Sequence, residues 1–336
     1  MKVGIIGCGG IAQVHGECYK HMNKASVVAV ADIVPERADK LAESLGAEAL
    51  YSAEELLKRT DIDVVDICLP TYLHCEYTIK AAEAGFHILC EKPIAVTLEE
   101  GEQMAEAAKK AGVKLMIAHV LRYFPENIDA KKVIESGAIG IPKVVRTYRG
   151  GTHPGRVRDW YEDINKSGGA IQDMAIHDID FLQSVIGPVK EVYALGNMHK
   201  NQKYNEYDVV LLEFNCGTLA HVIADWSKPK GASFATSMEI AGTEGIVEYD
   251  STVSTPIKVL MEKSEQGGGD GVAVPESPLH PESGPYFREI AEFLEAVEND
   301  TEPPIKTEAA LEALRVALAA RKSIETGRPV KLEEEM

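Results

Sequence analysis

The sequence predicts an α/β protein with two domains: a doubly wound parallel sheet over residues 1–120, then an α/β domain with an open, mainly antiparallel sheet over residues 121–336. Three observations predict this division. The chain has 336 residues, more than one ordinary core needs. Strand and helix patterns alternate up to residue 120, which is typical of parallel sheets. Beyond that point, strand patterns follow one another directly, which is typical of antiparallel sheets.

The first domain shows short apolar runs, each followed by a helical pattern. The apolar runs predict buried strands at 1–7, 26–32, 63–71, 87–93 and 113–120. The intervening segments predict helices at 7–22, 35–46, 52–61, 73–85 and 97–112. Ser52 and Thr97 are placed to cap two of these helices, and Gly46 is placed to end another.

The second domain is mainly strand. Strands are predicted at 142–151, 189–199, 207–217, 218–227 and 237–250. Helical patterns cover 168–186 and, near the end of the chain, 286–300 and 307–327. The glycine-rich stretch 265–271 follows no buried strand and opens no helix, so it is interpreted as a connecting loop and not as a phosphate-binding loop.

Composition limits the possible partners and the compartment. The net charge of −18 argues against nucleic acid, because phosphate binding needs a basic surface. No apolar run approaches the roughly 18 residues of a membrane span, and no signal peptide precedes the first strand. The six cysteines are scattered without a Cys-x-x-Cys pair, which favours buried, reduced thiols in a cytoplasmic protein. The histidines and cysteines show no metal-ligand spacing, so no metal is expected.

The stretch GCGGIA at residues 7–12 has the pattern G-x-G-x-x-A between a buried strand and a helix, the context of a dinucleotide-binding turn. Gly7 permits the tight turn, Gly9 lets the backbone approach a pyrophosphate, and Ala12 allows close packing of helix and strand. The N–H groups of Gly10 and Ile11 then lie at the helix N-terminus, where phosphates bind. The alternative is a tight turn without a ligand.

Asp32 ends the second strand, about 20 residues beyond the glycines, where a carboxylate accepts hydrogen bonds from the adenosine ribose. A carboxylate there would repel a 2′-phosphate. Ile33 follows directly, and the nearest cation is Arg37. The sequence therefore favours NAD over NADP.

Lys92 lies at the carboxyl end of the predicted strand 87–93, just past its apolar residues and directly before Pro93. The carboxyl ends of parallel strands face the ligand crevice, so this lysine could hydrogen-bond a substrate oxygen. From position alone, a surface lysine in a turn is the favoured interpretation.

These segments together resemble the glucose–fructose oxidoreductase / inositol dehydrogenase / rhizopine-catabolism (Gfo/Idh/MocA) family. The resemblance covers almost the whole chain and rests on a specific set of motifs in this order: GCGGIA at 7–12, LPTYLH at 69–74, EKPIA at 91–95, SGGAIQDMAIHDID at 167–180, GTEG at 242–245 and the C-terminal stretch 310–330. Two positions depart from the family pattern. The loop reads Pro70-Thr71-Tyr72-Leu73 before its histidine, and Ala170 replaces a frequent glycine.

The resemblance implies a Rossmann domain, NAD(P)-linked hydride transfer and roles for particular residues. Lys92, Asp173 and His177 match the family's catalytic positions. The cofactor-binding set is expected to comprise Gly7, Gly9, Gly10, Ile11, Ala12, Asp32, Ile33, Arg37, Leu69, Pro70, Thr71, His74, Glu91, Lys92 and Arg122. The substrate-binding set is expected to comprise Lys92, Asp173 and His177, together with candidates that lie near the domain junction and the loop before the helix 168–186: Arg122, His153, Trp160, Tyr161 and Asn165.

The predicted helix 168–186 places Asp173, His177, Asp180 and Ser184 on one face. Periodicity alone is equally consistent with a solvated face, and the family resemblance favours a catalytic one. A histidine is suited to accept the alcohol proton near neutral pH, and a carboxylate one turn earlier can orient it. Asp180 is interpreted as structural.

The expected function is an NAD-dependent oxidoreductase acting on a hydroxyl or keto carbon of a sugar, polyol or cyclitol, similar to inositol dehydrogenases. One alternative is a reductase of a keto-sugar, nucleotide-sugar or dihydrodiol-like substrate. An alternative of another class is a non-catalytic NAD(H)-binding redox sensor, which the retention of Lys92, Asp173 and His177 disfavours. The family also implies a homodimer or homotetramer formed through the C-terminal sheet.

Overall fold

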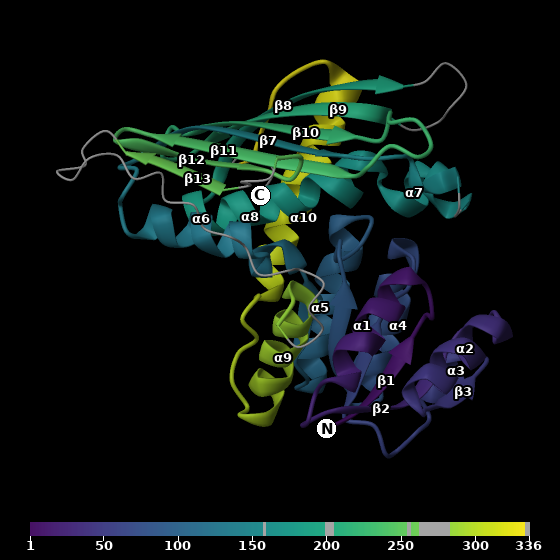
Figure 1. Cartoon of the computed structure of the whole chain (residues 1–336). Coiled ribbons are helices and arrows are strands. Elements are labelled where there is room, and N and C mark those ends of the chain that lie inside the picture. The colour runs from purple at the N-terminus through teal and green to yellow at the C-terminus, as the bar shows by residue number, and fades with distance from the viewer. Residues whose placement is uncertain (157–158, 199–204, 254–256, 262–282, 333–336) are drawn as a thin grey trace. The chain divides into compact units, whose positions relative to one another are not determined.

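The computed structural model describes residues 1–156, 159–198, 205–253, 257–261 and 283–332 (Figure 1). The chain forms two compact units. The N-terminal unit is Met1–Tyr123 with Ser277–Leu311, described from residue 283, and the C-terminal unit is Phe124–Glu276 with Glu312–Met336. The division predicted at residue 120 placed every later residue in the second domain, whereas the Ser277–Leu311 segment belongs to the N-terminal unit. The predicted loop at 265–271 lies outside the described residues.

The N-terminal unit contains a six-stranded sheet in the order β3-β2-β1-β4-β5-β6, with all neighbours parallel. Its strands are β1 Lys2–Ile6, β2 Ser26–Ala31, β3 Glu48–Leu50, β4 Val64–Ile67, β5 His87–Glu91 and β6 Leu115–Ala118. The short strand β3 was not predicted, because its residues are partly exposed and form no apolar run. The order reverses between β1 and β4, and ligands bind at the carboxyl ends of strands at such a point.

The helices of this unit begin and end largely where the sequence predicts. They are α1 Gly10–Lys20, α2 Pro35–Leu45, α3 Ala53–Leu56, α4 His74–Glu83, α5 Leu98–Ala111 and α9 Pro285–Glu298, with short 3₁₀ turns at Thr71–Leu73 and Val120–Tyr123. The predicted caps are confirmed. Ser52 accepts the N–H of Glu54, Thr97 forms a capping box with Glu100, and Gly46 ends α2 in a left-handed conformation.

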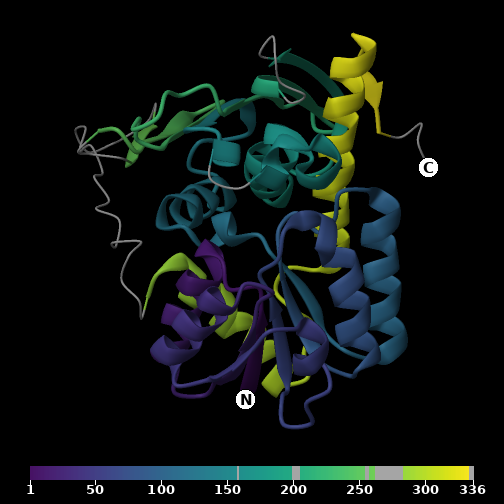
Figure 2. The same cartoon turned by 90° about the vertical axis from the view of Figure 1, so that its right-hand side faces the viewer.

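The helix α9 is part of the core of the N-terminal unit. It contacts α1 and β5, and both views show it beside α1 (Figures 1 and 2). Three of its side chains, Ile290, Phe293 and Leu294, are buried in one cluster with residues of β1, β2 and β4. The segment therefore completes a core that the first 123 residues leave open.

The C-terminal unit contains an eight-stranded sheet in the order β13-β12-β11-β7-β10-β9-β8-β14. Its strands are β7 Pro142–Gly150, β8 Val189–Met198, β9 Asn205–Phe214, β10 Leu219–Asp225, β11 Ala235–Gly242, β12 Gly245–Asp250, β13 Ile257–Met261 and β14 Val330–Lys331. The sheet is antiparallel except for the pair β7 and β10. The expected open, mainly antiparallel sheet is confirmed.

The helices α6 Pro125–Glu135 and α8 Ile176–Ile186 lie along one face of this sheet (Figure 1). The remaining helices of the unit are α7 Ile164–Ser167, a π-helical turn at Ile171–Ala175, 3₁₀ turns at Pro154–Arg156 and Asp159–Glu162, and the part of α10 Thr307–Thr326 that begins at Glu312. Within the part of the chain that the structure describes, none of the helices has the length and apolar character needed to cross a bilayer.

Candidate active site

The glycine loop between β1 and α1 has the geometry that its sequence predicts. Gly7 has φ +90°, and a Cβ atom there would lie 2.6 Å from the backbone oxygen of Cys68 on the adjacent strand connection, so only glycine fits. A Cβ on Gly9 would meet nothing within 4 Å, which leaves open space beside the backbone. Ala12 is fully buried. Because Gly9 is the N-cap and offers no side chain, the first N–H groups of α1 remain available to a phosphate.

Asp32 follows β2 and faces the same loop. Its Oδ2 accepts the backbone N–H of Cys8 at 2.7 Å, and its Oδ1 accepts that of Val34 at 2.8 Å. A carboxylate can accept about four hydrogen bonds, so two lone pairs remain for ribose hydroxyls. The neighbouring Ile33 and Arg37 are both exposed, Ile33 at 87%. The residues present at this end of the sheet therefore fit a dinucleotide without a 2′-phosphate.

The loop after β4 is fixed by a buried histidine. The ring nitrogens of His74 lie 2.9 Å from the carbonyl oxygen of Leu69 and 2.8 Å from that of Pro93. Burial lowers the pKa of His74 and so favours a neutral ring. A neutral imidazole carries a single N–H group, so it donates to one of these two carbonyl oxygens at a time. The histidine thus joins the predicted segment that contains Pro70 and Thr71 to the segment that carries Lys92.

Lys92 directly follows β5, as predicted, and is half-buried. Its backbone N–H donates to Oε2 of Glu91 at 3.2 Å. The other carboxylate oxygen of Glu91, Oε1, lies 3.2 Å from Nε2 of His15 on α1. Glu91 therefore connects the lysine to the interior of the unit. Arg122, in the 3₁₀ turn after β6, is also half-buried.

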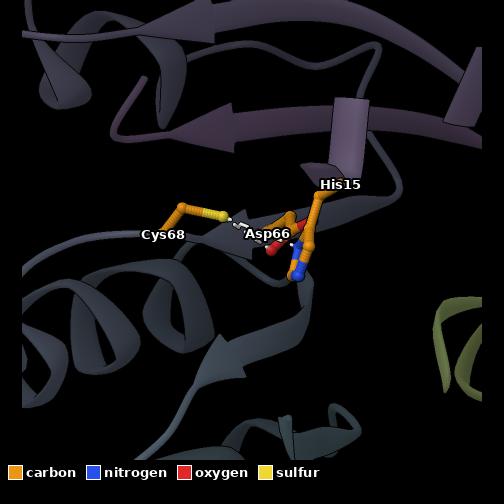
Figure 3. A group of neighbouring side chains, drawn as sticks. All are labelled: His15, Asp66 and Cys68. Atoms are coloured by element: carbon orange, nitrogen blue, oxygen red, sulfur yellow. Dashed lines mark hydrogen bonds and ion pairs between the residues drawn. The ribbon is translucent and has the colours of Figure 1, made fainter. Parts of the chain in front are cut away.

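A buried polar cluster that the sequence did not predict lies next to Glu91. His15, Asp66 and Cys68 come from α1, β4 and the residue after β4, and Figure 3 shows His15 and Cys68 directed toward Asp66. Nδ1 of His15 donates to Oδ2 of Asp66 at 2.9 Å, and Sγ of Cys68 donates to Oδ1 at 3.4 Å. An available signal was the charged Asp66 within the apolar run VVDIC.

This cluster is the group among the described residues whose donor atoms lie close enough together, within 4.8 Å, to hold a metal ion. Burial raises the pKa of the Cys68 thiol far above its ordinary value, so the thiol keeps its proton and is a poor metal ligand. Asp66 instead accepts hydrogen bonds from His15 and Cys68, while Nε2 of His15 makes an ion-pair contact with Glu91 and has no hydrogen-bond partner among the described residues.

The C-terminal unit carries the second group of predicted residues, Asp173 and His177, which are both half-buried. The segment predicted as one helix begins with the π-helical turn Ile171–Ala175 and continues as α8. Asp173 lies in the π turn and His177 in the first turn of α8. Wide π turns of this kind occur frequently at functional sites.

The residues predicted to share the polar face of this helix differ in their exposure. Asp173 and His177 are half-buried, whereas Asp180 is buried, with 1% of its surface exposed. The helix is anchored to the sheet by another carboxylate. Arg149 of β7 donates to both oxygens of Asp178 at 2.9 and 3.3 Å. Arg321 of α10 donates to Oε1 of Gln172 at 2.6 Å and so anchors the π turn.

The candidate substrate residues before this helix form an aromatic cluster. The ring of His153 packs edge-on against Trp226 with 4.6 Å between centroids, and Tyr161 packs edge-on against the same ring at 5.9 Å. Trp160 stacks on Tyr161 at 3.9 Å. His153 is buried and its Nδ1 accepts the N–H of Gly155. Asn165 is exposed and its backbone N–H donates to Asp163, the N-cap of α7.

Comparison with known proteins covers both units. Residues 1–119 match the Gfo/Idh/MocA description "Oxidoreductase family, NAD-binding Rossmann fold", and residues 131–332 match "Oxidoreductase family, C-terminal alpha/beta domain". A myo-inositol 2-dehydrogenase from Thermotoga maritima is 31% identical, over 99% of each chain. An NAD⁺-dependent scyllo-inositol 2-dehydrogenase from Bacillus subtilis is 30% identical, over 99% of this chain and 96% of the relative. A levoglucosan dehydrogenase in complex with NADH is 25% identical, with a TM-score of 0.88 over 99% of each chain.

Proposed function

Because the chain belongs to the Gfo/Idh/MocA oxidoreductase family and is an NAD(P)-dependent dehydrogenase, we propose that it oxidises a ring hydroxyl of a cyclitol or sugar, with Lys92, Asp173 and His177 as its catalytic residues. NAD is the proposed cofactor. The single observation that carries the cofactor choice is the Asp32 carboxylate, which is fixed by Cys8 and Val34 and keeps two lone pairs for ribose hydroxyls.

When NAD⁺ is bound, its nicotinamide accepts the hydride that leaves the alcohol carbon. The protein must then receive the proton of the hydroxyl group. His177 is the proposed base, because a histidine changes its charge near neutral pH. Asp173 is proposed to orient the imidazole and to stabilise its cationic form. Lys92 is proposed to stabilise the negative charge that develops on the substrate oxygen.

The proposed substrate class rests on the activities of the relatives. Two of those named above act on inositols, and one solved relative is a levoglucosan dehydrogenase. These substrates share a six-membered ring that carries secondary hydroxyls. The aromatic cluster of Trp160 and Tyr161 offers apolar faces of the kind that pack against sugar rings.

The function is tested by following NADH fluorescence with a panel of inositol isomers, anhydrosugars, free sugars and acyclic polyols. We expect NAD⁺ reduction with at least one cyclic member of the panel, and NADH oxidation with the corresponding ketone. Absence of turnover with the whole panel, in both directions, would contradict the proposed substrate class.

The role of Lys92 is tested by Lys92→Ala. We expect kcat to fall by about 10²–10³, because one charge-stabilising donor is lost, while the Kd for NAD⁺ stays within about threefold of wild type. The matched control is Lys109→Ala, which removes an exposed lysine from the end of α5. Turnover of the Lys92→Ala variant at the wild-type rate would rule out the proposed role.

We also propose that the protein is a cytoplasmic homodimer or homotetramer that associates through the face of the C-terminal sheet opposite α6 and α8. The support is a set of outward side chains on neighbouring strands, Leu195, Leu211 and Leu219, that are 57%, 45% and 56% exposed. Large exposed apolar patches mark association surfaces. Light scattering should give a mass of two or four chains, and Leu211→Glu should reduce it toward one chain.

A further inference from the structure

We propose that His15 is a positioning residue for Lys92: its cationic ring, held between Asp66 and Glu91, fixes the Glu91 carboxylate that accepts the backbone N–H of Lys92. The inference rests on the proposed function, because it concerns the catalytic role given to Lys92. It extends the site from the half-buried Lys92 into the interior of the N-terminal unit, to the fully buried side chains of His15 and Asp66.

The contacts form a continuous chain of three side chains. Nδ1 of His15 lies 2.9 Å from Oδ2 of Asp66, and Nε2 lies 3.2 Å from Oε1 of Glu91. Oε2 of Glu91 then lies 3.2 Å from the backbone nitrogen of Lys92. The side chains of His15 and Asp66 are fully buried and that of Glu91 is 9% exposed. Water therefore competes little for these contacts.

Both ring nitrogens of His15 face carboxylate oxygens, which accept hydrogen bonds and cannot donate them when ionised. A neutral ring would direct a lone pair at one of the two carboxylates. A doubly protonated ring donates a charge-assisted hydrogen bond to Asp66 and faces Glu91 in an ion pair at 3.2 Å, which does not have the geometry of a hydrogen bond. Burial, the largest single effect, lowers the pKa of His15, but the charges and hydrogen bonds of Asp66 and Cys68 together raise the pKa well above its ordinary value.

The groups around the ring support this charge state. The hydroxyl of Tyr19 donates to Oδ2 of Asp66 at 3.0 Å, and the Cys68 thiol donates to Oδ1. Each oxygen of Asp66 therefore accepts a hydrogen bond from one of these two groups. On the remaining sides, Tyr286 of α9 presents its ring at 6.0 Å, and Cys18, Glu17 and Glu289 are further titratable side chains in the neighbourhood.

The cluster consequently has two carboxylates and one cation, and its net negative charge lies directly behind the Lys92 backbone. Glu91 uses one oxygen for the histidine and the other for the lysine N–H, so rotation of its carboxylate would break both contacts. Loss of His15 should allow that rotation. Misplacement of a catalytic group by about 1 Å can cost about 10² in rate.

The charge state of the His15 ring is tested by a measurement that does not depend on enzyme activity. In ¹⁵N-histidine-labelled protein, the His15 ring signals are identified by their absence in His15→Gln and followed from pH 6 to 9. We expect the shifts of an imidazolium with both nitrogens protonated at pH 7.5. A neutral ring at that pH, or a stoichiometric metal ion found by elemental analysis, would overturn the inference whatever the substrate.

The positioning role is tested by combining His15→Gln with Lys92→Ala. In the wild-type background we expect His15→Gln to lower kcat by about tenfold to a hundredfold, with the Kd for NAD⁺ changed less than about threefold. In the Lys92→Ala background it should lower kcat no further, because its effect passes through the lysine. An equal loss in both backgrounds would show a general structural role and overturn the inference.

Two further variants serve as controls for the effects of His15→Gln on the fold. His21→Gln, at the end of the same helix, removes a histidine that is more exposed and pairs with Glu17, and it should leave kcat unchanged. Tyr19→Phe removes only one hydrogen bond to Asp66 and keeps the ring in place. If His15→Gln does not fold, Tyr19→Phe should still lower kcat about twofold to fivefold in wild type and not in Lys92→Ala. Failure of Lys92→Ala itself to lower kcat would instead refute the proposed function.

Discussion

The carboxylate of Asp32 accepts the backbone N–H of Cys8 at 2.7 Å, and so the residue proposed to select the cofactor also holds the glycine loop. A substitution at this position changes the ribose contact and the loop together. Its second contact, with the N–H of Val34, is removed at the same time.

We expect Asp32→Ser combined with Ile33→Arg to move the preference from NAD toward NADP. The double substitution removes the charge that repels a 2′-phosphate and adds a cation at an exposed position. The ratio of kcat/KM for NADP to that for NAD should rise at least about tenfold, equivalent to about 1.4 kcal/mol. Glu36→Gln, which removes an exposed carboxylate from the first turn of α2, serves as the control. Tighter binding of NADP(H) than NAD(H) by the wild type would refute the premise.

We expect His177→Gln to lower kcat by about 10² and to flatten the pH–rate inflection, because glutamine keeps hydrogen-bonding atoms but does not titrate near neutral pH. Asp173→Asn should lower kcat less. The two effects should be non-additive, since both side chains would serve one proton transfer. His221→Gln on β10 is the control. Changes below about threefold for both variants would indicate an ordinary helix face.

We expect the stability difference between wild type and His15→Gln to decrease as pH rises. The pKa of His15 is raised in the folded protein, so the protonated ring stabilises the fold. This contribution to the free energy of unfolding is fully present below the unfolded pKa of about 6.5 and is lost as pH rises through the folded pKa. Above pH 6.5 the difference should shrink by up to about 1.4 kcal/mol per pH unit. Urea denaturation at pH 6 and pH 9 measures it. A difference that grows with pH would contradict the assigned charge state.

We expect Cys216 to react first with iodoacetamide. It is the exposed one of six free cysteines, and its hydrogen bond with Thr218 lowers its pKa. Burial raises the pKa of Cys75 to about 11, and Cys8, Cys18, Cys68 and Cys90 are buried. Peptide mass spectrometry at pH 7.5 should find one rapidly modified site, and Cys216→Ser should abolish it. Equal labelling of Cys75 would contradict this order.

Local sequence signals predicted five of the six strands of the N-terminal sheet, because these five contain buried apolar runs, and capping residues marked three of its helices. Ser52, Thr97 and Gly46 act through neighbours within a few residues, so their roles are visible in the sequence. The fixed conformation of Gly7 follows in the same way from the turn that it must make.

The features that the sequence did not predict depend on distant contacts. The π turn at Ile171–Ala175 is anchored by Arg321, about 150 residues later in the chain. The hydrophobic periodicity of the segment does not indicate that contact. The parallel pairing of β7 with β10 likewise depends on the order of the strands in the sheet, where these two are neighbours although they are far apart in the sequence. The chain from Asp66 through His15 to Glu91 joins three elements, and nothing in any one of them indicates the partners.

The contribution of α9 to the first core has a consequence for synthesis of the protein. A nascent chain that has emerged from the ribosome only through β6 lacks Ile290, Phe293 and Leu294, and the apolar surface that they cover stays exposed. Domains usually fold in the order in which they are translated. Here the cofactor-binding unit begins first and is completed almost last, so it must wait for the C-terminal unit to be translated before its own core can close.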